Sequence, residues 1–85
     1  MPINVSNKLK VMTLSSDKIH RIIGERIRDI RKQQRLTQEE LAEKAGIDRS
    51  HMGFIEQGRR QPTVTTLHKI AQALSVSFEK LFRGL

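Results

Sequence analysis

The sequence contains no cysteine, tryptophan or tyrosine, and only three phenylalanines and two prolines in 85 residues. Without cysteine the chain can form no disulfide, no thiolate metal site and no thiol nucleophile. Aromatic residues make up 4% of the chain, few for a module that stacks single-stranded bases. Apolar runs are far shorter than the roughly 20 residues that span a bilayer, and residues 1–16 lack a signal-peptide core. We therefore expect a cytoplasmic protein with an aliphatic core and no membrane association.

Catalytic groups are also scarce. A chain of 85 residues accommodates one small domain and leaves too little polypeptide to enclose a substrate pocket. No Ser, His and Asp residues are grouped, and His20, His51 and His68 are too dispersed for metal-ligand spacing. We therefore predict that the protein is not an enzyme and binds neither a metal nor another cofactor.

Positive charge is what the sequence has in excess. Sixteen Lys and Arg residues against nine Asp and Glu residues give a net charge of +7, which favours a polyanionic partner. A generic basic surface that serves solubility is the alternative. The charge is segmented, however: residues 18–35 carry +5 and residues 57–69 carry +3, whereas residues 36–56 carry −3. Two basic segments that flank an acidic one require a more specific explanation than solubility.

The first helical pattern begins after an irregular stretch. Residues 1–15 lack helical periodicity, which predicts a flexible N-terminal arm before a domain over residues 16–85. A short strand or partner-clamping segment over residues 8–14 is the alternative. From Asp17 to about Gln34, isoleucines recur at helical spacing and form one stripe, with Ser15 or Ser16 as the N-cap. The stripe consists of Ile19, Ile22, Ile23, Ile27 and Ile30.

Gly24 interrupts this helix. Glycine there costs about 1 kcal/mol relative to alanine, so it predicts the close approach of another helix.

Residues 37–57 have the signature of a helix-turn-helix. Thr37 and Glu40 match a capping box, in which the threonine hydroxyl accepts from the Glu40 amide and the Glu40 carboxylate reaches back. Gly46 ends that helix because glycine tolerates the left-handed conformation of a C-terminal cap, and Asp48 is the next N-cap. The two predicted helices cover residues 38–45 and 49–57.

Two more helices are predicted beyond Gly58. Thr63 caps the first, and Ser77 caps a short fifth helix. We therefore predict an all-α domain of five helices. The apolar stripe of the fourth helix is Val64, Leu67, Ile70, Ala71 and Leu74, and that of the fifth is Phe78, Leu81 and Phe82.

The stretch Ile23–Phe82 resembles the lambda Cro/C1-type (XRE-like) helix-turn-helix family, above all in LTQEELAEKAGI and IEQGRRQPT. The resemblance implies a lambda repressor-like fold and a transcriptional regulator or repressor that binds a palindromic DNA operator. The short apolar C-terminal helix and the letters DRSHM are also similar to controller proteins of restriction–modification systems. Short phage and plasmid repressors and some antitoxins share this layout. An antitoxin or other protein-binding module that autoregulates its operon is therefore the alternative function.

The resemblance also implies that the helix starting at Arg49 enters the major groove. Arg49 is then expected to bond guanine bidentately, with Ser50 facing a base or phosphate; otherwise Arg49 is a solvated surface residue. Phe54 departs from the family, which usually has a polar residue there. It is expected either to contact a thymine methyl or to pack sideways onto the domain or a partner. Expected phosphate-contacting residues are Gln38, Arg59, Arg60 and Thr63.

Two pairs of residues are expected to have structural or assembly roles. In the family, the arginine matching Arg31 pairs with the acid matching Glu56, so these two are expected to form a structural ion pair. The apolar C-terminal segment exceeds what one short helix can bury, which predicts a homodimer interface at Phe82 and Leu85. The alternative is that this segment folds onto its own domain and that pairing happens only on DNA. Double-stranded DNA, a second copy of the chain and RNA polymerase are the candidate partners.

Overall fold

The computed structural model describes residues 14–85, so nearly all of the predicted N-terminal arm lies outside the described residues. The described part is all-α, as predicted, and has the lambda repressor-like arrangement. Its helices are α2 (Ser16–Gln33), α3 (Gln38–Ala45), α4 (Arg49–Glu56), α5 (Val64–Ala73) and the 3-10 helix η1 (Phe78–Leu81).

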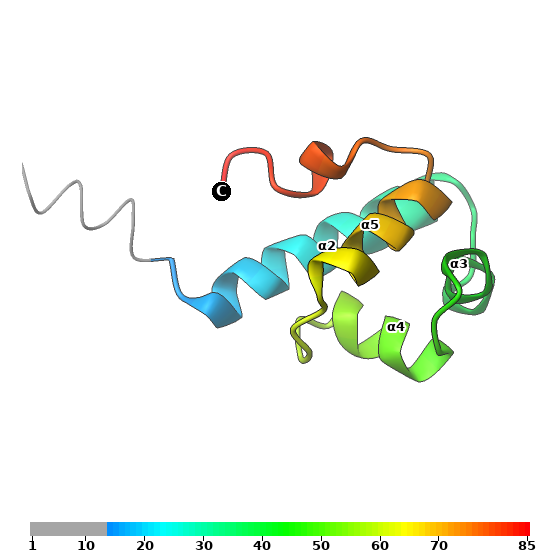
Figure 1. The fold of residues 1–85 in the computed structure, drawn as a ribbon, viewed down its shortest axis with the longest axis horizontal. Helices are drawn as coiled ribbons and strands as arrows, with labels where there is room; N and C mark the ends of the chain where they lie inside the picture. The colour runs from blue at the N-terminus through cyan, green and yellow to red at the C-terminus, as the bar shows by residue number, and fades with distance from the viewer. Residues whose placement is uncertain (1–13) are drawn as a thin grey trace, which may run out of the picture.

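The long helix α2 is the scaffold of the domain (Figure 1). Helix α3 packs on α4 and α5, α4 packs on α2, and η1 rests on α2 and α5. One aliphatic core joins all five elements, and its fully buried side chains include Ile27, Leu41, Met52, Ile55, Ile70, Leu74 and Leu81. No helix within residues 14–85 combines the length and the apolar character needed to cross a bilayer.

The start of α2 follows the predicted signal, and its end is closed by a residue that the sequence did not single out. The Ser15 hydroxyl accepts a hydrogen bond from the Lys18 amide at 3.1 Å, which satisfies one of the free amides at the helix start. The last turn is closed by Arg35, which adopts a left-handed φ of 59°. Of the isoleucine stripe, Ile23, Ile27 and Ile30 are buried.

Gly24 marks a close approach of α2 to another helix. A side chain at this position would collide with the carbonyl oxygen of Ile55 and would lie 2.7 Å from that of Glu56. The predicted helix contact is therefore confirmed, and the partner is the C-terminal end of α4. This contact fixes α4 against the scaffold.

The turn between α3 and α4 forms as predicted, with one difference at Asp48. The Thr37 hydroxyl accepts from the Glu40 amide at 3.0 Å, and the Glu40 carboxylate accepts from the Thr37 amide at 2.8 Å. Gly46 caps α3 with a φ of 70°. Asp48 occupies the N-cap position of α4, but its side chain makes no capping hydrogen bond.

The C-terminal segment differs from the sequence prediction in two ways. The expected fifth helix is four residues of 3-10 helix, and Ser77 at its start makes no side-chain capping bond. A segment this short forms too few backbone hydrogen bonds to sustain an α-helix by itself. Val64, assigned to the inner stripe of its helix, is 70% exposed, because it lies in the first turn of α5, beyond the edge of the core.

Candidate nucleic-acid interface

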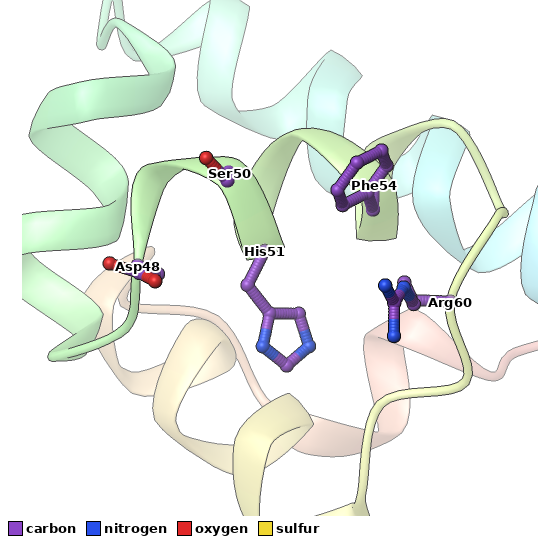
Figure 2. A pocket seen from close by; sticks show the side chains of 5 residues that line it. All are labelled: Asp48, Ser50, His51, Phe54 and Arg60. Carbon is purple, nitrogen blue, oxygen red and sulfur yellow. The ribbon is translucent and has the colours of Figure 1, made fainter.

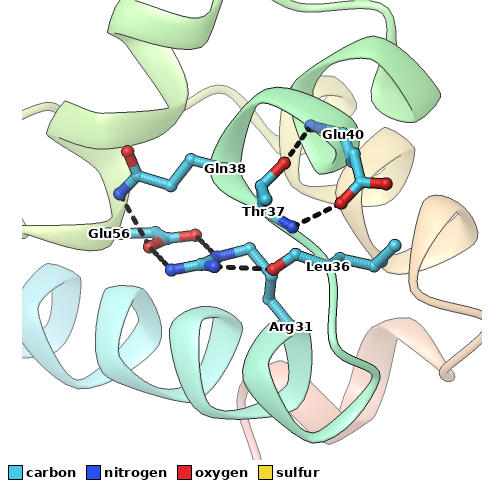
Figure 3. A network of polar contacts seen from close by, with 6 residues as sticks. All are labelled: Arg31, Leu36, Thr37, Gln38, Glu40 and Glu56. Atoms are coloured by element: carbon cyan, nitrogen blue, oxygen red, sulfur yellow. Dashed lines mark hydrogen bonds and ion pairs between the residues drawn. The ribbon is translucent and has the colours of Figure 1, made fainter.

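A buried polar network joins α2, α3 and α4 (Figure 3). Arg31 donates to both carboxylate oxygens of Glu56, at 2.7 and 3.0 Å, and to the Leu36 carbonyl at 2.8 Å. Gln38 at the start of α3 donates to the same carboxylate at 3.0 Å. Every buried side-chain nitrogen and oxygen in the described residues has a partner. The network therefore fixes the start of α3 relative to the end of α4.

Gln38 takes part in the buried network and can also bind an acceptor outside it. Its amide nitrogen is bound to Glu56 through one hydrogen, and an amide carries a second hydrogen that remains for another acceptor. The first backbone amides of α3 have no acceptor within the helix and so favour an anion. The Glu40 carboxylate is already one such anion, and its hydrogen bond from the Thr37 amide lowers the pKa of Glu40 from its ordinary value.

Helix α4 presents one side to the core and the other outward. Met52, Ile55 and Glu56 are buried, whereas Arg49 and Ser50 in its first turn are exposed. No hydrogen bond or ion pair among residues 14–85 occupies the Arg49 side chain. The two residues predicted to contact bases at the helix start are therefore accessible together.

A hollow of about 250 Å³ lies beside this outer side of α4 (Figure 2). Asp48, Ser50, His51, Phe54 and Arg60 line it, and His51 lies between Asp48 and Arg60. From the sequence, His51 is predicted only to be one of three histidines too dispersed to ligate a metal. The positions of Ser50 and Phe54 could have indicated that His51 lies beside them, because residues 50, 51 and 54 share one side of an α-helix.

Phe54 contacts both arginines of the following loop. The guanidinium carbons of Arg59 and Arg60 each lie 5.4 Å from the centre of the Phe54 ring, within cation–π range. Arg59 also donates to Gln57 at 3.5 Å, a long hydrogen bond. This aromatic and arginine cluster was not predicted from the sequence.

Thr63 is the N-cap of α5. Its hydroxyl accepts from the Thr66 amide at 3.1 Å and donates to the Thr66 hydroxyl at 3.0 Å. The predicted N-cap is thus confirmed, and the hydroxyl is already occupied in this role.

The C-terminal residues form a partly exposed aromatic surface, remote in sequence from the helix-turn-helix. The Phe78 and Phe82 rings lie 5.0 Å apart and both are half-buried. Leu81 is fully buried, as expected, whereas Leu85 is 40% exposed. Phe78 and Phe82 therefore share one environment, although only Phe82 of the two is predicted to lie at a dimer interface.

The comparisons with known proteins agree with this geometry. Residues 27–81 match the HTH_3 family, described as "Helix-turn-helix". The chain is 40% identical over 63 residues to the control protein C.SmaI of Serratia marcescens, covering 74% of this chain and 75% of that protein. It is 46% identical over 54 residues to the immunity repressor of Bacillus phage phi105, covering 64% of this chain and 38% of that protein.

A solved structure gives the same result. The restriction–modification controller protein C.AhdI of Aeromonas hydrophila superposes with a TM-score of 0.73 and 36% identity, covering 74% of this chain and 96% of that one. The chain belongs to the HTH_3, XRE-like helix-turn-helix family. It is a sequence-specific DNA-binding transcriptional regulator.

Proposed function

We propose that this regulator inserts α4 into the major groove of a palindromic operator and that Arg49 and Ser50 contact base edges there. The main support is that both side chains are exposed in the first turn of α4. The opposite side of this helix is fixed by the core and by the Arg31–Glu56 pair. The Arg49 guanidinium can donate two parallel hydrogen bonds to guanine O6 and N7. Its contact then discriminates one G·C pair by roughly 1–3 kcal/mol.

The phosphate backbone is contacted on either side of α4. Gln38 keeps one amide hydrogen and the adjacent backbone amides of α3, and Arg59 and Arg60 supply two charges from the loop. Thr63 contributes through the start of α5, by its backbone amide, because its hydroxyl is engaged with Thr66. These contacts explain the basic segment at residues 57–69.

Binding-site selection from a random duplex pool tests the function, and two single substitutions test the assignments. Arg49→Ala should abolish the preference at one G·C position, whereas Arg59→Ala should weaken binding to all duplexes alike. Arg83→Ala removes a charge outside the helix-turn-helix and is the matched control. Equal losses from Arg49→Ala and Arg59→Ala on selected and random duplexes would contradict the assignment, and a pool without an enriched site would contradict the function.

The regulator acts as a homodimer through Phe82 and Leu85. One helix-turn-helix reads too few base pairs to find a genomic site, and pairs of motifs bind half-sites about 34 Å apart. The half-exposed Phe82 and the exposed Leu85 supply an apolar surface for such pairing. Sedimentation at tens of micromolar should give a dimer that Phe82→Glu dissociates. A monomer, or a dimer unaffected by Phe82→Glu, would contradict this interface.

The similarity to C.SmaI and C.AhdI favours a controller role in a restriction–modification operon, with RNA polymerase as the protein that the bound regulator recruits or blocks. Transcription in vitro from the operon promoter tests this role. Added protein should change transcript yield in a manner that Arg49→Ala removes, and a yield independent of the protein would contradict it.

A further inference from the structure

We propose that Phe54 is a positioning residue that holds Arg59 and Arg60 ready to bind the DNA backbone, rather than a residue that reads a thymine methyl. This inference rests on the proposed function and assigns a different task to one residue of the same interface. The supporting observation is a cluster in which one aromatic ring of α4 faces two guanidinium groups of the following loop.

The geometry brings a ring from a rigid element to side chains from an irregular one. Phe54 lies in the last turns of α4, two residues before Glu56, whose carboxylate is fixed by Arg31. Both guanidinium carbons lie 5.4 Å from the ring centre, where the negative face of an aromatic ring attracts a cation. Among residues 14–85, neither arginine forms an ion pair. Their charges are therefore held near one another without being neutralised.

Arginine is suited to such an arrangement. A guanidinium group that stacks on a ring keeps its N–H donors at the edge of its plane, free to bind phosphate oxygens. A free arginine must give up side-chain rotamer freedom when it binds, which lowers affinity. Restricting Arg59 and Arg60 before DNA arrives removes part of that cost. Phe54 therefore strengthens backbone binding without itself touching DNA.

This role also explains why an aromatic residue stands where the resemblance leads one to expect a polar one. Phenylalanine cannot hydrogen-bond a base, but its ring provides a surface that organises the loop. Base recognition then falls on Arg49 and Ser50 at the other end of α4.

Two substitutions separate the two roles of Phe54. Phe54→Tyr keeps the aromatic face, whereas Phe54→Leu keeps an apolar side chain that can still touch a thymine methyl but attracts no cation. Affinities should be measured over a range of salt on the selected operator and on a scrambled duplex, with melting temperatures to verify folding. Phe54→Tyr should match the wild type on both duplexes. Phe54→Leu should lose about two- to tenfold in affinity for each arginine on both duplexes, because each side chain must then be ordered on binding, and should show a shallower salt dependence.

The opposite pattern would overturn the proposal. If Phe54→Leu binds the scrambled duplex as the wild type does at every salt concentration, the ring does not position the arginines. An operator with uracil in place of thymine lacks the methyl groups. If uracil substitution lowers the affinity of the wild type but not that of Phe54→Ala, Phe54 recognises a thymine methyl instead.

A coupling experiment tests the same link within the protein. In a chain that already carries Arg59→Ala and Arg60→Ala, Phe54→Leu should cause no further loss of affinity. Fully additive losses would overturn the proposal.

Nuclear magnetic resonance of the protein without DNA tests the geometry separately. The side-chain Nε–H signals of Arg59 and Arg60 should show ring-current shifts that Phe54→Leu removes and Phe54→Tyr retains. Signals that do not respond to Phe54→Leu would overturn the cluster. A wild-type chain that shows these shifts but binds no duplex would instead overturn the proposed function, so the two failures are distinguishable.

Discussion

Two ion pairs in this molecule have nearly the same geometry and opposite surroundings. Arg31 meets Glu56 through two hydrogen bonds of 2.7 and 3.0 Å, and Arg83 meets Glu79 through two of 3.1 and 2.9 Å. The side chains of the first pair are 10% and 1% exposed, whereas those of the second are 69% and 64% exposed. The chemistry is shared, so any difference in effect must come from the environment.

The comparison teaches that a buried ion pair between separate helices supports the whole fold, whereas an exposed pair within one short segment does not. Arg31 and Glu56 are 25 residues apart and link α2 to α4, and neither charge can return to water without opening the core. Glu79 and Arg83 are only four residues apart in the sequence, and each is solvated whether or not the other is present. Exposed pairs of this kind contribute little because water and salt screen them.

The largest effect is expected from breaking the buried pair on one side. Glu56→Ala should lower the free energy of unfolding by about 3–5 kcal/mol, because Arg31 is left as an uncompensated buried charge. Gln38 loses its acceptor in the same variant. Urea denaturation measures the change, with Glu79→Ala as the matched exposed control. Equal stability of the two variants would show that burial does not distinguish the pairs.

The second prediction extends the contrast to two helical glycines. Gly24→Ala should lower the free energy of unfolding by about 1–3 kcal/mol, because the new methyl group meets the backbone carbonyls of Ile55 and Glu56. Gly53→Ala is the control: the nearest atom to its new methyl group, on the flexible Gln38 side chain, is 3.6 Å away. Alanine there should stabilise α4 by up to about 1 kcal/mol. Thermal melts that place both variants on the same side of the wild type would contradict the helix contact.

An intermediate effect is expected at the capping box. Thr37→Ala should destabilise the protein by about 1 kcal/mol, because the Glu40 amide loses the hydroxyl that accepts its hydrogen bond. The exposed Thr65, inside α5, provides a Thr→Ala control without a cap. A denaturation midpoint for Thr37→Ala that matches that of Thr65→Ala would show that the cap does not stabilise the fold.

A smaller and pH-dependent effect is expected at Glu40. Its pKa lies below the ordinary value of 4.5, chiefly because the Thr37 amide donates to the carboxylate. A group whose pKa is lower in the folded state adds stability above its unfolded pKa and loses that contribution as the pH falls through the folded value. The melting temperatures of the wild type and Glu40→Gln should therefore differ most at neutral pH and converge below pH 4.5. A difference that is constant across this range would contradict the assignment.

The smallest effect is expected from the exposed pair. Arg83→Ala should leave the melting temperature unchanged within error, although the Arg83 guanidinium lowers the pKa of Glu79. The pair is solvated, so removing one partner strands no buried charge. A clear drop in melting temperature that high salt abolishes would show that this surface pair stabilises the C-terminal segment after all.

Local signals made most of the helices predictable. Ser15, Thr37, Gly46 and Thr63 each act through hydrogen bonds or backbone angles within a few residues, so the sequence contains the whole interaction. Prediction was weaker at the edge of the core and in the C-terminal segment. Val64 has the right spacing for the core but lies beyond its edge, and η1 is too short for its own hydrogen bonds to fix an α-helix.

The candidate site divides in the same way. The exposed position of Arg49 and Ser50 at the start of α4 was predictable from the Gly46 turn, because local sequence sets where this helix begins. Their base-contacting role is a prediction from the family resemblance. The role of Phe54 could not be assigned, since helical spacing places it outward without saying what meets it. The contact depends on how the loop after Gly58 folds back, and Arg59 and Arg60 lie outside the helix whose period was used.

By itself, the sequence determined an all-α domain and its helix-turn-helix, because periodicity, caps and turn residues act over short distances along the chain, and its family resemblance together with its excess of positive charge implied DNA binding. Only the tertiary structure decided which carbonyl groups pack closely against Gly24, how Gln38 joins the Arg31–Glu56 pair, and that Phe54 faces two arginines. These contacts join residues on separate elements. Their geometry follows from packing around one core, which no single stretch of sequence contains.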